Sequence, residues 1–98
     1  MEVSFKDESL DKVETDPGET GGFPQPVVTV FRKRLQLIRS ALDERDFYQL
    51  KSLHFEKLKG TRAHQHSMRL NDQYRLILEF EGKAPNKVVV IISIEDYH

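Results

Sequence analysis

Cationic and imidazole side chains are concentrated between Leu53 and Arg75. This stretch, LHFEKLKGTRAHQHSMRLNDQYR, contains three Arg, two Lys and three His in a chain of 98 residues with a formal net charge of -1. Guanidinium groups bind anions such as phosphate through paired hydrogen bonds, and imidazole exchanges protons near neutral pH. The stretch therefore predicts a local cationic site that can hold an anion and move a proton.

The pattern along this stretch predicts that a sheet displays the cations. Apolar and polar residues alternate over residues 53–58 and 64–70, while residues 59–61 and 71–72 have the composition of turns. Successive side chains of a strand point to opposite faces. We expect His66 to face the core or the helix layer. One face then carries Ser67, Arg69 and Asn71, and the other carries His66, Met68 and Leu70.

Length and composition limit the class of protein. A chain of 98 residues with 38% apolar side chains predicts a single domain spanning residues 1–98. The absence of cysteine excludes a disulfide framework, a thiolate nucleophile and Cys-ligated zinc. No apolar run approaches the roughly 20 residues of a membrane helix, and the acidic residues 1–7 do not resemble a signal peptide. We therefore expect a cytoplasmic protein without membrane contacts.

Charge is distributed unevenly along the chain. Residues 1–24 contain two basic and seven acidic residues, whereas the remaining residues contain 13 basic and nine acidic ones, and all four His lie in the second half. The positive field is therefore concentrated around the cationic stretch.

The first half of the chain predicts a short strand followed by helices. Residues 2–5 alternate as in a strand, residues 7–13 favour a helical turn, and residues 14–26 favour a loop rich in Pro and Gly. Pro26 suits the first position of a helix that we expect to end near Leu42. Its apolar stripe consists of Val27, Phe31, Leu35, Ile38 and Leu42, and the opposite face of Arg32, Lys33, Gln36 and Arg39.

The second half predicts mainly strands. A short helix within residues 43–50 should turn Phe47 and Leu50 inward. Residues 74–80 alternate, and residues 88–94 are almost continuously apolar, as in a strand covered on both faces. These elements predict an α+β fold, with an N-terminal strand and helices on one face of a small, mainly antiparallel sheet. The other face should be left open at Lys59, Arg69 and Arg75.

Three motifs together resemble a known family. They are the L-K-G turn within residues 58–62, the S-x-R-x-N-D-Q-x-R pattern within residues 66–76, and the D-Y-H end at residues 96–98. In this order they closely resemble the HigB-type killer toxins of bacterial toxin-antitoxin systems, which belong to the RelE/ParE superfamily of small α+β toxins. The resemblance extends over nearly the whole chain.

The resemblance implies an endoribonuclease that needs no metal or other cofactor. Such toxins cleave messenger RNA in the decoding site of the translating ribosome. A helix-turn-helix antitoxin, here HigA-like, neutralises them, and the complex of the two contacts operator DNA through the antitoxin.

The resemblance also implies the site residues. Lys59, Arg75 and His98 match the catalytic positions of the family, and Arg69, Arg62 and Tyr97 are the expected contacts to RNA or phosphate. Some members have a catalytic His at the position of Glu56. Glu56 and His54 are therefore secondary candidates.

The roles of these residues follow from RNA chemistry without a metal, in which a 2'-hydroxyl attacks the adjacent phosphate. Arg75 suits the phosphate because a guanidinium is always charged and forked. His98 suits proton transfer, Lys59 suits either charge stabilisation or the base, and Tyr97 suits base stacking. Which of Lys59 and His98 accepts the proton stays open.

Two other functions remain open alternatives at this point. A ParE-like protein would poison DNA gyrase through protein contacts, and a degenerate toxin would only bind antitoxin and operator DNA. His64 and His66, expected on one strand face, invite a zinc site, but no recognisable ligand spacing completes it, so no metal is expected.

Overall fold

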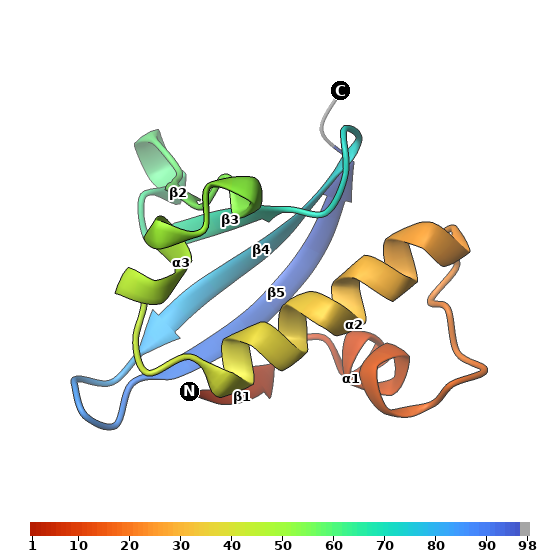
Figure 1. Ribbon diagram of the computed structural model, residues 1–98, viewed down its shortest axis with the longest axis horizontal. Coiled ribbons are helices and arrows are strands. Elements are labelled where there is room, and N and C mark those ends of the chain that lie inside the picture. The colour runs from red at the N-terminus through yellow and green to blue at the C-terminus, as the bar shows by residue number, and fades with distance from the viewer. Residues whose placement is uncertain (97–98) are drawn as a thin grey trace.

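The computed structural model describes residues 1–96, and within them five strands form one sheet with helices on one face (Figure 1). The strands are β1 (Glu2–Phe5), β2 (Glu56–Lys57), β3 (Gln65–Arg69), β4 (Tyr74–Glu81) and β5 (Val88–Asp96). The helices are α1 (Glu8–Thr15), α2 (Gln25–Ser40) and α3 (Arg45–Gln49), with 3-10 turns η1 (Lys51–Leu53) and η2 (Gly60–Arg62). The strand order is β1-β5-β4-β3-β2, in which only the β1–β5 pairing is parallel among the described residues. The predicted α+β fold is confirmed.

Helix α2 forms the layer that covers the sheet. Pro24 precedes its first turn, where Pro26 loses no intrahelical hydrogen bond because the first N–H groups of a helix have no partner. The buried residues of the predicted stripe are Val27, Phe31, Leu35 and Ile38, which pack with Met68, Leu76, Leu78 and Ile91 of the sheet. This face of the sheet contains the hydrophobic core.

The sequence predicts Leu42 and Leu50 in the core, and both predictions are wrong. Each residue lies just beyond the end of a helix. α2 ends at Ser40, and the extended backbone of Ala41 turns Leu42 into solvent, where it is 90% exposed. α3 ends at Gln49, and Leu50 is 43% exposed. Helical periodicity places a side chain only while the helix continues.

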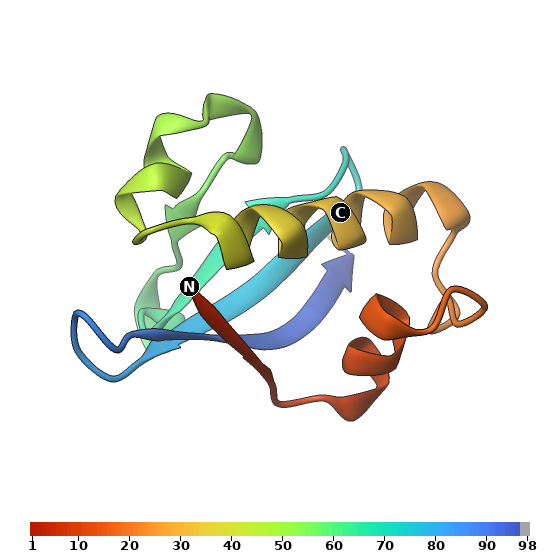
Figure 2. The ribbon, with the colours of Figure 1, turned by 60° about the horizontal axis from the view of Figure 1, so that its bottom comes forward.

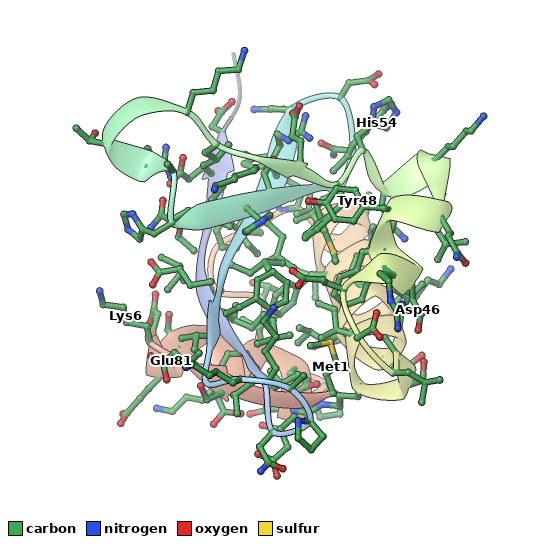
Figure 3. The ribbon with its side chains drawn as sticks, turned by 90° about the vertical axis from the view of Figure 1, so that its left-hand side faces the viewer. Met1, Lys6, Asp46, Tyr48, His54 and Glu81 are labelled. Atoms are coloured by element: carbon green, nitrogen blue, oxygen red, sulfur yellow. The ribbon has the colours of Figure 1, made fainter. Side chains whose placement is uncertain are left out.

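The face of the sheet opposite α2 is less open than the sequence predicts. In register, Ser67 pairs with Ile77, and Ile77 pairs with Ser93, so these side chains share that face. Ser67 and Ile77 are nevertheless fully buried. The β2–β3 connection with η2 lies on this side of the sheet, away from α2 and α3 (Figure 3). The connection therefore covers part of this face opposite α2, which we call the second face of the sheet.

Arginines of α2 hold the acidic N-terminal part of the chain. Figure 2 shows α1 and the following loop beside the first turns of α2. The Arg32 guanidinium donates to the carbonyls of Val13 (2.9 Å), Asp16 (3.0 Å) and Glu19 (3.2 Å). Arg32 is thus half-buried rather than on the solvent face that the helical pattern predicts.

His66 lies in an aromatic cluster on the helix side of the sheet, as predicted. Its ring stacks on Phe55 at 5.1 Å between centroids and meets Phe80 edge-on at 5.1 Å. Burial lowers the pKa of His66. His64, expected on the same face, lies instead outside β3 with Nε2 3.6 Å from Glu79 Oε2. Because Glu79 and Phe80 are adjacent on β4, the two histidines lie on opposite faces.

Candidate functional site

Two arginines lie side by side at one end of the second face. Arg69 of β3 and Arg75 of β4 are Cα partners in the antiparallel register. Like charges directly opposite each other on a sheet repel, and here each guanidinium contacts an acid: Arg69 contacts Asp72, and Arg75 Nη2 lies 3.1 Å from Glu56 Oε1. Both arginines line a cavity of about 220 Å³. The arrangement can bind an anion that replaces the carboxylates.

The backbone of His54 fixes the position of Arg75. The Arg75 side chain is only 14% exposed, and its Nη2 donates to the carbonyl oxygen of His54 at 2.8 Å. His54 ends η1 in the left-handed conformation, with φ 45° and ψ 47°, which costs of order 1–3 kcal/mol for a residue other than Gly. His54 also lines the cavity, so the strained residue belongs to the site.

A tight turn between β3 and β4 fixes the position of Arg69. Asn71 Oδ1 accepts hydrogen bonds from the backbone N–H groups of Gln73 (2.8 Å) and Tyr74 (2.7 Å), as expected of an Asn in a turn. From α2, Arg34 Nε donates to the Arg69 carbonyl at 3.3 Å, and burial lowers the pKa of Arg34. Helix and turn therefore both hold the end of β3.

The end of β5 lies beside the arginines. Tyr74 pairs with Asp96 and Arg75 with Glu95 in register, and Gln73 Nε2 donates to Asp96 Oδ2 at 3.0 Å. Tyr97 and His98, predicted as an RNA contact and a catalytic residue, lie outside the described residues.

The structure brings together some of the predicted residues and separates others. Arg69, Arg75 and His54 line the cavity, and Glu56 reaches it through its ion pair with Arg75. Lys59 is exposed at the residue before η2 and is not part of the described cavity lining. Arg62 forms an ion pair with Glu95 on β5.

Four residues near the site were not predicted as site residues. The sequence placed Asn71 on the face of Arg69 and both Asn71 and Asp72 in a turn and in the family motif, without a role at the site. The i, i+3 spacing of Arg69 and Asp72 is the local signal for their contact. Arg34 flanks the apolar stripe of α2, and this position on the helix is the sequence signal that it lies close to the sheet. Glu95 carries no local signal, because its closeness to Arg62 and Arg75 depends on strand register. These residues are Asn71, Asp72, Arg34 and Glu95.

A larger cavity, of about 810 Å³, lies elsewhere, between the loop after α2 and the β4–β5 hairpin. Charged residues in its lining pair with each other: Arg45 with Asp43 at 2.8 Å, and Lys87 with Glu44 at 2.5 Å. Ion pairing does not distinguish the two cavities, because Arg69 and Arg75 are paired with acids too. The smaller cavity is the better candidate for anion chemistry because two arginines lie side by side in its lining.

Residues 1–96 contain neither a cluster of metal-binding side chains nor a membrane-spanning helix. No group of three or more His, Cys, Asp or Glu residues in this range could hold a metal ion. Every helix within this range is too short or too polar to span a lipid bilayer.

A protein-family model matches residues 3–98, and its description is the RelE-like toxin of the type II toxin-antitoxin system HigB. The chain belongs to the HigB-like toxin family. A comparison with curated proteins found no match.

Solved structures support the same fold for this HigB-like toxin. A YoeB/ParE toxin from Agrobacterium tumefaciens is similar, with a TM-score of 0.65 and 18% identity over 100% of both chains. A chain of the YoeB-YefM complex from Staphylococcus aureus has a TM-score of 0.61 and 19% identity, over 100% of this chain and 97% of that one. At these identities the likeness concerns the fold alone.

Proposed function

We propose that this toxin is a ribosome-dependent endoribonuclease that cleaves messenger RNA during translation. The observation that carries the proposal is the pair Arg69 and Arg75, fixed side by side on a sheet at a cavity in a member of the HigB-like family. The RelE-type toxins that this family resembles are typically ribonucleases of this kind. The strands set the spacing of the two guanidinium groups before substrate arrives, which lowers the cost of binding.

The reaction needs no metal ion. The 2'-hydroxyl oxygen forms a bond to the adjacent phosphorus, the bond to the 5' oxygen breaks, and a 2',3'-cyclic phosphate and a 5'-hydroxyl result. One group takes the proton from the 2'-hydroxyl and another gives a proton to the 5' oxygen. Arg75 and Arg69 stabilise the negative charge that builds up on the phosphorane oxygens.

Three residues compete for the proton transfers. Lys59 and His98 come from the family motif, and Glu56 gains support from its ion pair with Arg75, because a phosphate bound by Arg75 would lie next to its carboxylate. Glu56 is more than half exposed and can turn away from Arg75 when phosphate arrives.

The proposed partners are a helix-turn-helix antitoxin, HigA-like, and the ribosome with its message, which places the activity in the cytoplasm. The similar chain from S. aureus was solved in a YoeB-YefM complex, which supports a protein partner. An antitoxin that covers the cavity would block the phosphate site, and the complex would reach operator DNA through the antitoxin.

The test is to induce the wild type and Arg75→Ala in separate cultures, follow growth and map the 5' ends of messenger RNA. We expect the wild type to stop growth and produce new cuts in phase with codons. Arg75→Ala should lower cleavage roughly 10²-fold or more, because one donor to the transition-state charge is lost. In vitro, the same variants are assayed on ribosomes programmed with a defined message.

Growth arrest without new cuts would contradict the ribonuclease proposal and indicate a target such as gyrase. An absence of both effects in the wild type would indicate a toxin that only binds partners. Thermal unfolding of Arg75→Ala is the control, since a folded but inactive variant separates lost chemistry from lost structure.

A further inference from the structure

Arg62 and Glu95 form a two-point ion pair on the second face of the sheet. Arg62 Nη1 lies 3.0 Å from Glu95 Oε1, and Nη2 lies 2.7 Å from Oε2. Arg62 Nε donates a further hydrogen bond to Gln65 Oε1 at 2.9 Å. Ser93 Oγ also donates to Glu95 Oε2 at 3.3 Å. Both oxygens of the Glu95 carboxylate are thus engaged.

Glu95 is the direct cross-strand neighbour of Arg75. The two residues are Cα partners between β4 and β5, so their side chains leave the same face with Cβ atoms roughly 5 Å apart. At this spacing the carboxylate of a Glu can form an ion pair with the guanidinium of the Arg opposite it. The Arg75 guanidinium instead donates to the His54 carbonyl and pairs with Glu56, on the β2 side of β4.

We propose that Arg62 is a positioning residue that holds Glu95 away from Arg75 and so keeps Arg75 directed at the cavity. This inference rests on the proposed phosphate-binding role of Arg75. It assigns Arg62 a role through Glu95, in place of the direct RNA contact that the family resemblance implies.

The negative charge of Glu95 allows it to compete with phosphate for Arg75. The hydrogen bonds from Arg62 lower the pKa of Glu95, so the carboxylate is charged at neutral pH. If Arg62 is removed, Glu95 keeps its charge at neutral pH because the ordinary pKa of a Glu is about 4.3. A charged and partly buried carboxylate next to an arginine favours an ion pair with it. Phosphate would then have to displace Glu95 as well as Glu56.

The test is a rescue experiment on programmed ribosomes. Arg62→Ala should lower kcat/KM roughly tenfold, mainly through a higher KM, because Glu95 competes with the message for Arg75. The double variant Arg62→Ala/Glu95→Gln should return to within about twofold of the wild type, since the competing charge is gone. Arg62→Lys keeps a cation on Glu95 and should remain close to the wild type.

Two controls calibrate the rescue. Glu95→Gln alone measures the effect of removing the carboxylate while Arg62 is present. Arg45→Ala removes an exposed arginine that pairs with Asp43 at the larger cavity, so it matches the loss of charge away from the site. Thermal unfolding of every variant checks that each is folded.

A double variant as impaired as Arg62→Ala would overturn the proposal, because Arg62 would then contact RNA itself or hold the loop of η2 in place. Full activity of Arg62→Ala would overturn it as well.

If the wild type cleaves no message, the ribonuclease proposal fails, and the competition is judged by a titration with inorganic phosphate. The NMR signal of Arg75 Nε–H reports binding without any turnover. Weaker binding by Arg62→Ala with recovery in the double variant supports the role of Arg62, and equal binding by all variants overturns it.

Discussion

The face of the sheet under α2 and the face under η2 hold different kinds of residues. Under α2, Leu76 and Leu78 are fully buried among aliphatic and aromatic side chains. Under η2, Ile77 of the same strand is equally buried, but this side of the sheet also holds ion-paired groups such as Arg62 and Glu95. Apolar burial supplies most of the folding free energy, whereas half-exposed ion pairs add little. The first face therefore provides most of the stability, and the second face adds oriented charges around a smaller buried part that contains Ile77.

Phe31→Ala, under α2, should cause the largest loss of unfolding free energy. The side chain is fully buried at the centre of α2, and its removal leaves a cavity that costs about 3–5 kcal/mol of unfolding free energy. Urea denaturation measures the loss, and Leu42→Ala, at a 90% exposed position, is the control that should change stability by less than about 0.5 kcal/mol. Equal losses in both variants would contradict the assignment of the core.

Ile77→Ala tests how well η2 covers the second face. Because Ile77 is fully buried, we expect a loss of about 2–5 kcal/mol in the same denaturation experiment, similar to a core position. Ile92→Ala, at a half-buried residue next to the irregular pairing of β4 and β5, should cost less. A loss under about 1 kcal/mol for Ile77→Ala would mean that the second face is open to solvent in solution.

Arg69→Ala should change activity more than stability. Arg69 is more exposed than Arg75, with 39% against 14% of the side chain accessible, so its loss should lower cleavage by about tenfold, less than the loss of Arg75. Single-turnover cleavage on programmed ribosomes gives the ratio, and Lys33→Ala, an exposed cation of α2, is the matched control. A larger loss for Arg69→Ala than for Arg75→Ala would reverse the proposed roles.

The smallest expected effect is on the pH dependence of stability, through His66 in the aromatic cluster under α2. Burial lowers the pKa of His66 below its unfolded value; Glu44 opposes this shift, and Lys57 and Lys87 add to it by smaller amounts. The folded state therefore binds fewer protons, and the stability contribution, complete above pH about 6.5, is lost as pH falls from there towards the folded pKa. Thermal unfolding from pH 8 to 5 should show a weaker pH dependence in His66→Leu. Parallel curves for wild type and variant would show that other groups cause the acid sensitivity.

Local patterns predicted the elements of the fold well. The alternation around Met68 and the spacing of Val27, Phe31, Leu35 and Ile38 are properties of neighbouring residues, so strands and helices could be recognised from them. Predictions failed at Leu42 and Leu50 because the ends of the helices depend on tertiary packing that the periodic pattern does not contain.

Long-range pairing limited what could be predicted about the site. The motif indicated Arg69 and Arg75, and one antiparallel hairpin brings them together. The contacts of Arg62 with Glu95 and of Arg75 with His54 join residues far apart in the sequence. They depend on the order and register of the strands, which alternation alone does not determine. The catalytic roles of Lys59, Arg75 and His98 stay predictions.

The position of β5 between β1 and β4 has a consequence for the order of folding. This strand joins the first strand of the described chain to the hairpins of the second half, and it is the last of the five to be synthesised. Until it emerges from the ribosome, β1 and β4 each lack a neighbour, and α2 has only part of its packing surface. Such distant pairings form slowly. A nascent chain therefore cannot complete this sheet until residue 96 has left the exit tunnel.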